Sequence, residues 1–281
     1  MVRTLCLLAM LAPALAGARS APDPAGARLE EIGFTSHETL LSGSLALPQD
    51  RPVRAALVFV HGSGKQTRNL ALAARFAAAG IAALVYDKRG AGKSGGVYEG
   101  EQSVSEQNIS LLADDAAAGL KALANRPELQ GIPIGISGIS QAGWIAPLAA
   151  GRSGIAKFIV LWSGPVCKVS EEDIFSIYTR DKDRPVAPSF REALESRTEK
   201  YIWPDFLGKD PDPADSLATL TIPGLWIFSD NDGSIPVDLS IERLQALRRT
   251  GHRYDYVLFS GLGHDNMDGT FATAIDWIVH R

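Results

Sequence analysis

The sequence predicts an α/β protein built around a doubly wound, mostly parallel sheet. Short, continuous apolar runs alternate along the chain with segments of helical periodicity, and glycine-rich or polar turns separate them. Continuous apolar runs are typical of strands that helices cover on both faces. The composition agrees, because 46% hydrophobic and 21% charged residues in a chain of 281 are enough for a full core.

Six apolar runs are predicted as core strands: AALVFV (55–60), IAALVY (81–86), IPIGIS (132–137), KFIVLW (157–162), GLWIF (224–228) and YDYVLF (254–259). Ahead of them, LEEIGFTSHETLLSGSLALP contains two β-like runs around Ser36-His37, which predicts a hairpin. Helical spacing of apolar residues predicts helices over 70–80, 103–125, 142–150, 239–249 and 270–281.

The alternation is interrupted once, between the fourth and fifth core strands. Residues 164–221 are polar, charged and punctuated by prolines, with helix-like pieces near 171–180 and 189–203. We interpret this stretch as an insertion that covers one end of the sheet. The core then consists of residues 25–163 and 222–281.

The N-terminal residues 1–20 have a different character. Arg3 precedes an apolar run from Leu5 to Leu15, and small residues follow, as in a secretory signal peptide. We therefore expect a secreted or periplasmic protein. No other segment approaches the ~20 apolar residues of a membrane-spanning helix, so no stable membrane span is expected once the signal is removed. The net charge of −4, without a basic cluster, argues against a nucleic-acid partner.

In a parallel sheet, ligand sites lie where the strands end at their carboxyl side. The segment after IPIGIS turns through GISQAG into a predicted helix and places Ser140 on the turn. A serine on a sharp strand-to-helix turn is exposed as a nucleophile, and its small neighbours let the strand and the helix pass closely. The usual pattern is G-x-S-x-G, and Ala142 stands at its second glycine. Ser137 is the competing serine, but bulky Ile139 lies two residues beyond it.

A serine nucleophile needs a base and an acid that orients the base. His264 follows the last core strand in Gly-Leu-Gly-His, so its loop can reach Ser140. Asp232, in the SDNDGSIP turn after GLWIF, is the predicted acid, and Asp230 is the alternative. The chain order of nucleophile, acid and base is Ser140, Asp232, His264, which is the order of one hydrolase fold.

The HGSG loop after the first core strand predicts an oxyanion hole. Its glycines allow backbone N–H groups to converge on a developing negative oxygen. The predicted donors are the N–H groups of Ser63 and Gln141. His61 is interpreted as a structural hydrogen-bonding residue of this loop.

Metal and nucleotide sites have little support. The histidines show no H-x-x-x-H or H-E-x-x-H spacing, and the calcium-like start at Asp230 lacks an acidic residue at its twelfth position, which is Ile241. The stretch GAGKSG matches G-x-G-x-x-G, but it follows an interior strand and does not open directly into a helix. We interpret it as a turn in which Asp87 and Arg89 form a structural charged network.

With its HGSG loop and the turn DKRGAGKS, the chain resembles the α/β-hydrolase superfamily, in particular secreted bacterial serine esterases. The resemblance implies the α/β-hydrolase fold, a small helical cap over 164–221, and hydrolysis of a small acyl ester through an acyl-enzyme without a cofactor. A serine peptidase or a thioesterase of the same fold is the alternative, and a non-catalytic binding module is a further one. Apolar walls for an acyl pocket are sought among Trp144, Trp162, Ile202 and Trp203.

Overall fold

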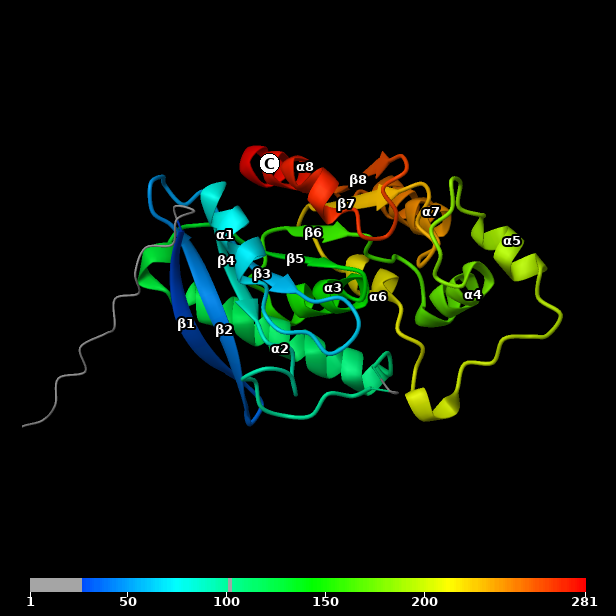
Figure 1. Cartoon of the computed structure of the whole chain (residues 1–281), viewed down its shortest axis with the longest axis horizontal. Coiled ribbons are helices and arrows are strands. Elements are labelled where there is room, and N and C mark those ends of the chain that lie inside the picture. The colour runs from blue at the N-terminus through cyan, green and yellow to red at the C-terminus, as the bar shows by residue number, and fades with distance from the viewer. Residues whose placement is uncertain (1–26, 101–102) are drawn as a thin grey trace, which may run out of the picture.

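A computed structural model of the chain describes residues 27–100 and 103–281; the predicted signal peptide lies outside them. One eight-stranded sheet, in the order β1-β2-β4-β3-β5-β6-β7-β8, runs through the molecule (Figure 1). Its strands are β1 (Ala27–Ser36), β2 (Thr39–Pro48), β3 (Ala55–Val60), β4 (Ile81–Tyr86), β5 (Ile134–Ile139), β6 (Ile159–Trp162), β7 (Gly224–Ser229) and β8 (Tyr254–Phe259). β1 pairs with β2, and β2 with β4, in antiparallel orientation. From β4 onward in this order, all neighbouring strands are parallel. The predicted fold class is confirmed.

Helices cover both faces of the sheet. They are α1 (Leu70–Ala78), α2 (Glu106–Ala124), α3 (Ala142–Ser153), α4 (Val169–Thr179), α5 (Phe190–Glu195), α6 (Pro213–Leu217), α7 (Val237–Arg249) and α8 (Met267–His280), with short 3-10 turns η1 (Pro127–Leu129) and η2 (Asp205–Leu207). α1 and α8 pack on one face, and α2, α3 and α7 on the other. Along β3, Val58 belongs to the α2–α3 core and the adjacent Leu57 to the α1–α8 core. The strand is apolar throughout because both of its faces are buried.

The structure corrects two elements of the region 164–221. The helix predicted over 189–203 ends at Glu195, and the chain then runs to Trp203-Pro204, where the proline disfavours helical backbone in the residue before it. The short helix α6 was not predicted. Its signals are nonetheless present, because the Asp212 carboxylate accepts from the backbone N–H of Ala214 and proline occupies the first helical position.

The residues between β6 and β7 fall into two parts. α4 and α5 lie beyond the end of the sheet, on the right of Figure 1, and pack on each other through a small apolar cluster of Ile174, Phe175 and Ala193. α6 instead packs against α3, beneath the sheet. α4 and α5 therefore stand out from the core, whereas α6 belongs to it.

Asp87 and Arg89, predicted as one network, belong to two separate ion pairs. Arg68 donates from Nε and Nη2 to the Asp87 carboxylate at 3.2 and 2.9 Å. Burial alone would raise the pKa of Asp87, but hydrogen bonds from Arg68 and from the Lys93 backbone lower it to about 2. Arg89 binds Asp115 of α2 through two hydrogen bonds instead.

Replacing Asp115 with alanine should lower the free energy of unfolding by about 3–5 kcal/mol, because Arg89 would remain buried without its partner. The two side chains are only 0% and 6% exposed. Urea unfolding measures the effect. Asp276→Ala, which removes an exposed carboxylate from α8, is the matched control and should leave the unfolding midpoint unchanged. A loss of equal size in both variants would contradict a role for the buried pair.

Candidate active site

Ser140 lies on the turn that joins β5 to α3. Its φ angle is 55°, a left-handed conformation that non-glycine residues rarely adopt. A Cβ at Gly138 would lie 2.5 Å from the Cβ of Ala142, so the methyl group of Ala142 fills the space that this glycine leaves open. A Cβ at Gly143 would meet Pro165 at 2.5 Å. The second glycine of the usual pattern can therefore be alanine, whereas Gly138 and Gly143 cannot carry a side chain.

Ser140, His264 and Asp232 form one chain of hydrogen bonds. His264 Nε2 lies 3.0 Å from Ser140 Oγ, and His264 Nδ1 lies 2.9 Å from Asp232 Oδ2. Asp232 is completely buried, and the side chain of His264 is 19% exposed. Three residues from the ends of β5, β7 and β8 thus meet at the carboxyl edge of the sheet.

The histidine loop is held by the turn after β7. Backbone N–H groups of residues 261–263 donate to side chains of residues 229–231. The bonds run from Gly261 to Asp230, from Leu262 to Ser229 and from Gly263 to Asn231, at 3.0, 3.0 and 2.7 Å. Asp230, the alternative acid, therefore binds the loop backbone and does not contact the imidazole.

A further carboxylate, Asp183, reaches this loop from the segment between α4 and α5. It accepts hydrogen bonds from the backbone N–H of Gly233 at 3.0 Å and of His264 at 3.3 Å. A Cβ at Gly263 would lie 2.0 Å from its Oδ2, so only glycine permits this approach. Asp183 was not predicted, because nothing local in the sequence relates residue 183 to the loop at 264.

The HGSG loop lies beside Ser140, since a Cβ at Gly62 would be 3.4 Å from the Cβ of Ser140. Among the described residues, the backbone N–H groups of Ser63 and Gln141 donate to no other protein atom. His61 is buried, with its ring edge-on to Tyr86 at 4.9 Å. Burial, and then the nearby charge of Lys88, lower the pKa of His61 to about 4, so this imidazole is neutral at neutral pH.

Unlike that of His61, the pKa of His264 is raised by its environment. Burial alone would lower its pKa, but the hydrogen bond and the charge of Asp232 outweigh burial and raise the pKa above the usual 6.5. The Asp232 carboxylate therefore stabilises the imidazolium that forms if His264 takes a proton from Ser140.

Activity that depends on His264 as a base should decrease as the pH falls through a midpoint above 6.5, because only neutral imidazole accepts a proton. The pH profile of kcat/KM checks this. A midpoint near pH 4 would contradict it and would indicate His61, whose pKa is lowered to about 4.

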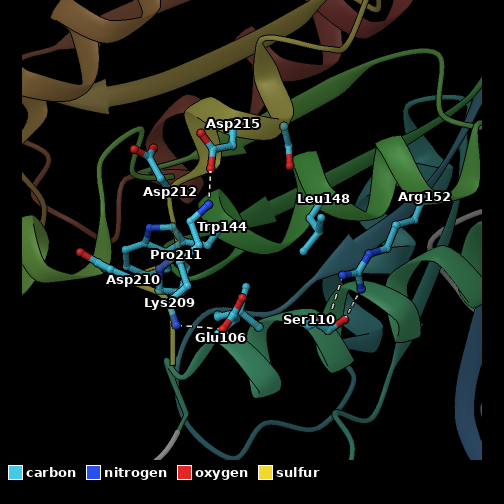
Figure 2. A pocket seen from close by; sticks show the side chains of 12 residues that line it. Glu106, Ser110, Trp144, Leu148, Arg152, Lys209, Asp210, Pro211, Asp212 and Asp215 are labelled. Carbon is cyan, nitrogen blue, oxygen red and sulfur yellow. Dashed lines mark hydrogen bonds and ion pairs between the residues drawn. The ribbon is translucent and has the colours of Figure 1, made fainter. Parts of the chain in front are cut away.

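A cavity of about 210 Å³ lies apart from these residues, between α2, α3 and the segment before α6 (Figure 2). Trp144 and Leu148 line it, and neither Ser140 nor His264 does. Lys209 Nζ binds Asp215 across its rim at 2.8 Å. Trp144 therefore lines this separate cavity, which does not include Ser140.

The other predicted acyl-pocket walls also lie elsewhere. Trp162 is buried in the α1–α8 core and donates to Thr270 Oγ1 at 2.9 Å. Ile202 is 78% exposed, and Trp203 donates to the carbonyl of Gly208. The sequence could not place them, because an apolar residue beside a turn is equally suited to the core.

Within residues 27–100 and 103–281, no helix is both long and apolar enough to cross a membrane. In the same part of the chain, no three His, Cys, Asp or Glu side chains gather as metal ligands would.

Comparison with known protein families shows to which family this chain belongs. The family model described as "Serine aminopeptidase, S33" matches residues 51–219, more than half of the chain. The chain belongs to this family of α/β hydrolases. One curated relative, a polyketide transferase of Penicillium crustosum, is 33% identical over 106 residues, or 38% of this chain. The chain spans about a third of that relative's length, since the match covers 32% of it.

Solved structures with the same fold include esterases and a peptidase. An esterase of Pyrococcus furiosus superposes with a TM-score of 0.65 at 19% identity, covering 95% of this chain and 93% of the esterase. Acetyl xylan esterase 1 of Thermoanaerobacterium gives a TM-score of 0.63 at 16% identity, with 93% and 86% covered. Acylaminoacyl peptidase of Pyrococcus horikoshii gives 0.62 at 18% identity, with 86% of this chain and 38% of the peptidase covered. At these identities the similarity establishes the fold.

Proposed function

We propose that this chain is a serine hydrolase that cleaves carboxylic esters through an acyl-enzyme intermediate. The observation that carries the proposal is the hydrogen-bonded chain from Ser140 Oγ through His264 to buried Asp232. Ser140 stands in the strained conformation of a nucleophile on a strand-to-helix turn. Family membership and the esterases that share the fold support the same reaction class.

The proposed reaction has two halves. Ser140 Oγ attacks the ester carbonyl carbon while its proton passes to His264 Nε2, and the carbonyl π electrons move to oxygen. When the tetrahedral intermediate collapses, the bond to the alcohol oxygen breaks and His264 returns the proton to it. Water then attacks the acyl-serine with His264 as the base, and the carboxylic acid leaves Ser140 regenerated.

The negative oxygen of each tetrahedral intermediate needs donors. Ser63 and Gln141 fit this role, because their N–H groups border Ser140 and are unpaired within the described part of the protein. In enzymes of this type, loss of one such donor lowers kcat by about 10²–10³.

A fluorophosphonate probe tests the proposal, because it reacts with an activated serine and with little else. Wild-type protein should be labelled on Ser140 and should hydrolyse p-nitrophenyl esters. Folded wild-type protein that neither takes the label nor cleaves any ester would overturn the enzyme assignment and favour a binding module.

A second candidate, an aminopeptidase, is favoured by Glu172 on α4. This side chain makes no hydrogen bond or ion pair with any described residue. Burial, and then the charges of Asp173, Asp181 and Asp232, raise its pKa well above the usual 4.5. A cation such as a peptide amino terminus would offset the repulsion between Glu172 and these neighbouring carboxylates.

Paired substrates separate the two candidates. If the protein is an aminopeptidase, aminoacyl p-nitroanilides should be better substrates than neutral esters, and Glu172→Gln should lower kcat/KM for the anilides alone. If it is an esterase, Glu172→Gln should leave the hydrolysis of neutral esters unchanged. The same serine–histidine pair can also serve thioesters, which the substrate panel should include.

We further propose that residues 1–20 direct the protein to the secretory pathway, on the strength of their charged and apolar regions. Expression of the full chain, followed by N-terminal sequencing of exported protein, tests this. A product that stays inside the cell with Met1 in place would contradict it.

A further inference from the structure

Lys88, in the turn after β4, is buried without a carboxylate partner. Its side chain lies beneath the HGSG loop, and the residue is 4% exposed. Nζ donates to Gly62 O at 2.9 Å, to Gly64 O at 3.2 Å and to Gln141 Oε1 at 2.8 Å. The neighbouring Asp87 is occupied by Arg68. A buried ammonium bound to three neutral oxygens is costly, which calls for a functional reason.

The bond to Gly62 determines the direction of one predicted oxyanion donor. The carbonyl of Gly62 and the N–H of Ser63 belong to the same peptide unit, and in a trans peptide they point in opposite directions. Because Lys88 holds the carbonyl, the Ser63 N–H points away from the ammonium. The cation also polarises the peptide unit and strengthens its N–H as a donor.

The bond to Gln141 restrains the second predicted donor. Lys88 holds Oε1 of this side chain, and Nε2 donates to the carbonyl of Ser103 at 2.9 Å. Gln141 is completely buried and follows Ser140 directly. One ammonium therefore joins the two segments that carry the two donor N–H groups.

We propose that Lys88 is a positioning residue for the oxyanion hole, which it assembles by holding Gly62, Gly64 and Gln141 on one ammonium. This inference rests on the proposed hydrolase function and adds a residue to it. An –NH₃⁺ group has three protons for three acceptors, and a neutral amine has only two. The arrangement thus requires the charged form.

The test compares an ester with its thionoester, in which sulfur replaces the carbonyl oxygen. Sulfur accepts hydrogen bonds poorly, so a thionoester gains little from an oxyanion hole, while both substrates need the same serine and histidine. Lys88→Met should lower kcat for the ester by about 10²–10³ with little change in KM, and lower thionoester turnover by less than about tenfold. Lys93→Met removes an exposed lysine of the same turn and should change neither.

A second measurement needs no variant. Burial lowers the pKa of Lys88 to about 8, so ester turnover by the wild-type protein should fall above that pH while thionoester turnover does not. The titratable groups around Lys88 do not account for such a fall. The pKa of His61 is lowered to about 4, that of Asp87 is lowered to about 2, and those of Tyr86 and Arg68 are raised above their usual values.

The outcomes separate this inference from the proposed function. If the wild-type protein takes no fluorophosphonate label, the proposed function fails. If it is labelled but Lys88→Met slows both substrates equally, or neither, Lys88 does not act through the oxyanion hole. Should Lys88→Met fail to fold, the wild-type pH profiles decide, and parallel profiles for the two substrates would overturn the inference.

Discussion

Replacing Ser140 or His264 by alanine should each lower kcat by about 10⁶, because neither group acts without the other. His264 Nε2 lies 3.0 Å from Ser140 Oγ, so the proton leaves the serine only through this imidazole. For the same reason, the double variant should be no slower than either single variant. Steady-state hydrolysis of an activated ester measures all three, and Ser140→Ala should also abolish fluorophosphonate labelling.

Ser137→Ala is the matched control. Ser137 lies on β5, three residues before Ser140, but it is completely buried and donates to the carbonyl of Val160 at 3.0 Å. Its loss should leave kcat unchanged. Two results would contradict the assignment: labelling that persists in Ser140→Ala and disappears in Ser137→Ala, or a double variant of Ser140 and His264 far slower than the single ones.

Asp232→Asn should lower kcat by about 10⁴ through the tautomer of His264. The backbone N–H groups of Ser234 and Ile235 donate to Asp232 Oδ1 at 2.8 and 3.1 Å, so an asparagine must place its oxygen there. Its NH₂ group then faces His264 Nδ1, which must accept. The ring proton moves to Nε2, which can no longer take the proton of Ser140.

Asp230→Asn provides the comparison, since it makes the same chemical change two residues away. Asp230 Oδ1 accepts from the backbone of Gly261, and an asparagine oxygen can accept equally well. Turnover should therefore stay close to that of the wild type. Equal losses of kcat in Asp230→Asn and Asp232→Asn would mean that both changes act by disturbing the turn after β7, and not through the tautomer of His264.

Much of this fold could be predicted from local patterns. β3 and β4 begin and end where their apolar runs do, because both faces of each strand are buried. β8 also matches its predicted bounds, although Asp255 and Leu258 of this edge strand are exposed. The turn of Ser140 was identifiable because small residues flank a serine between a strand and a helix. The helix predicted over 189–203 was wrong in length: it ends at Glu195, and Pro204 disfavours helical backbone in the residue before it.

Other features depend on the direction of single side chains. The sequence favoured Asp232 over Asp230 in one turn but left both open, and the structure shows that Asp230 binds the loop of His264 while Asp232 binds its ring. Lys88 is one of two lysines in the turn DKRGAGKS, and only the folded structure shows that its ammonium lies beneath the HGSG loop.

Local sequence patterns were enough to predict the sheet, the order of its main elements and the candidate chemistry of Ser140 and His264, because apolar periodicity and turn residues act over a few neighbouring positions. The three-dimensional contacts were needed to show that Asp232 binds the His264 ring while Asp230 does not, that Asp183 reaches the histidine loop and that Lys88 joins the predicted oxyanion donors. Those contacts join residues far apart in the chain, and whether they form depends on distances and directions that no local pattern contains.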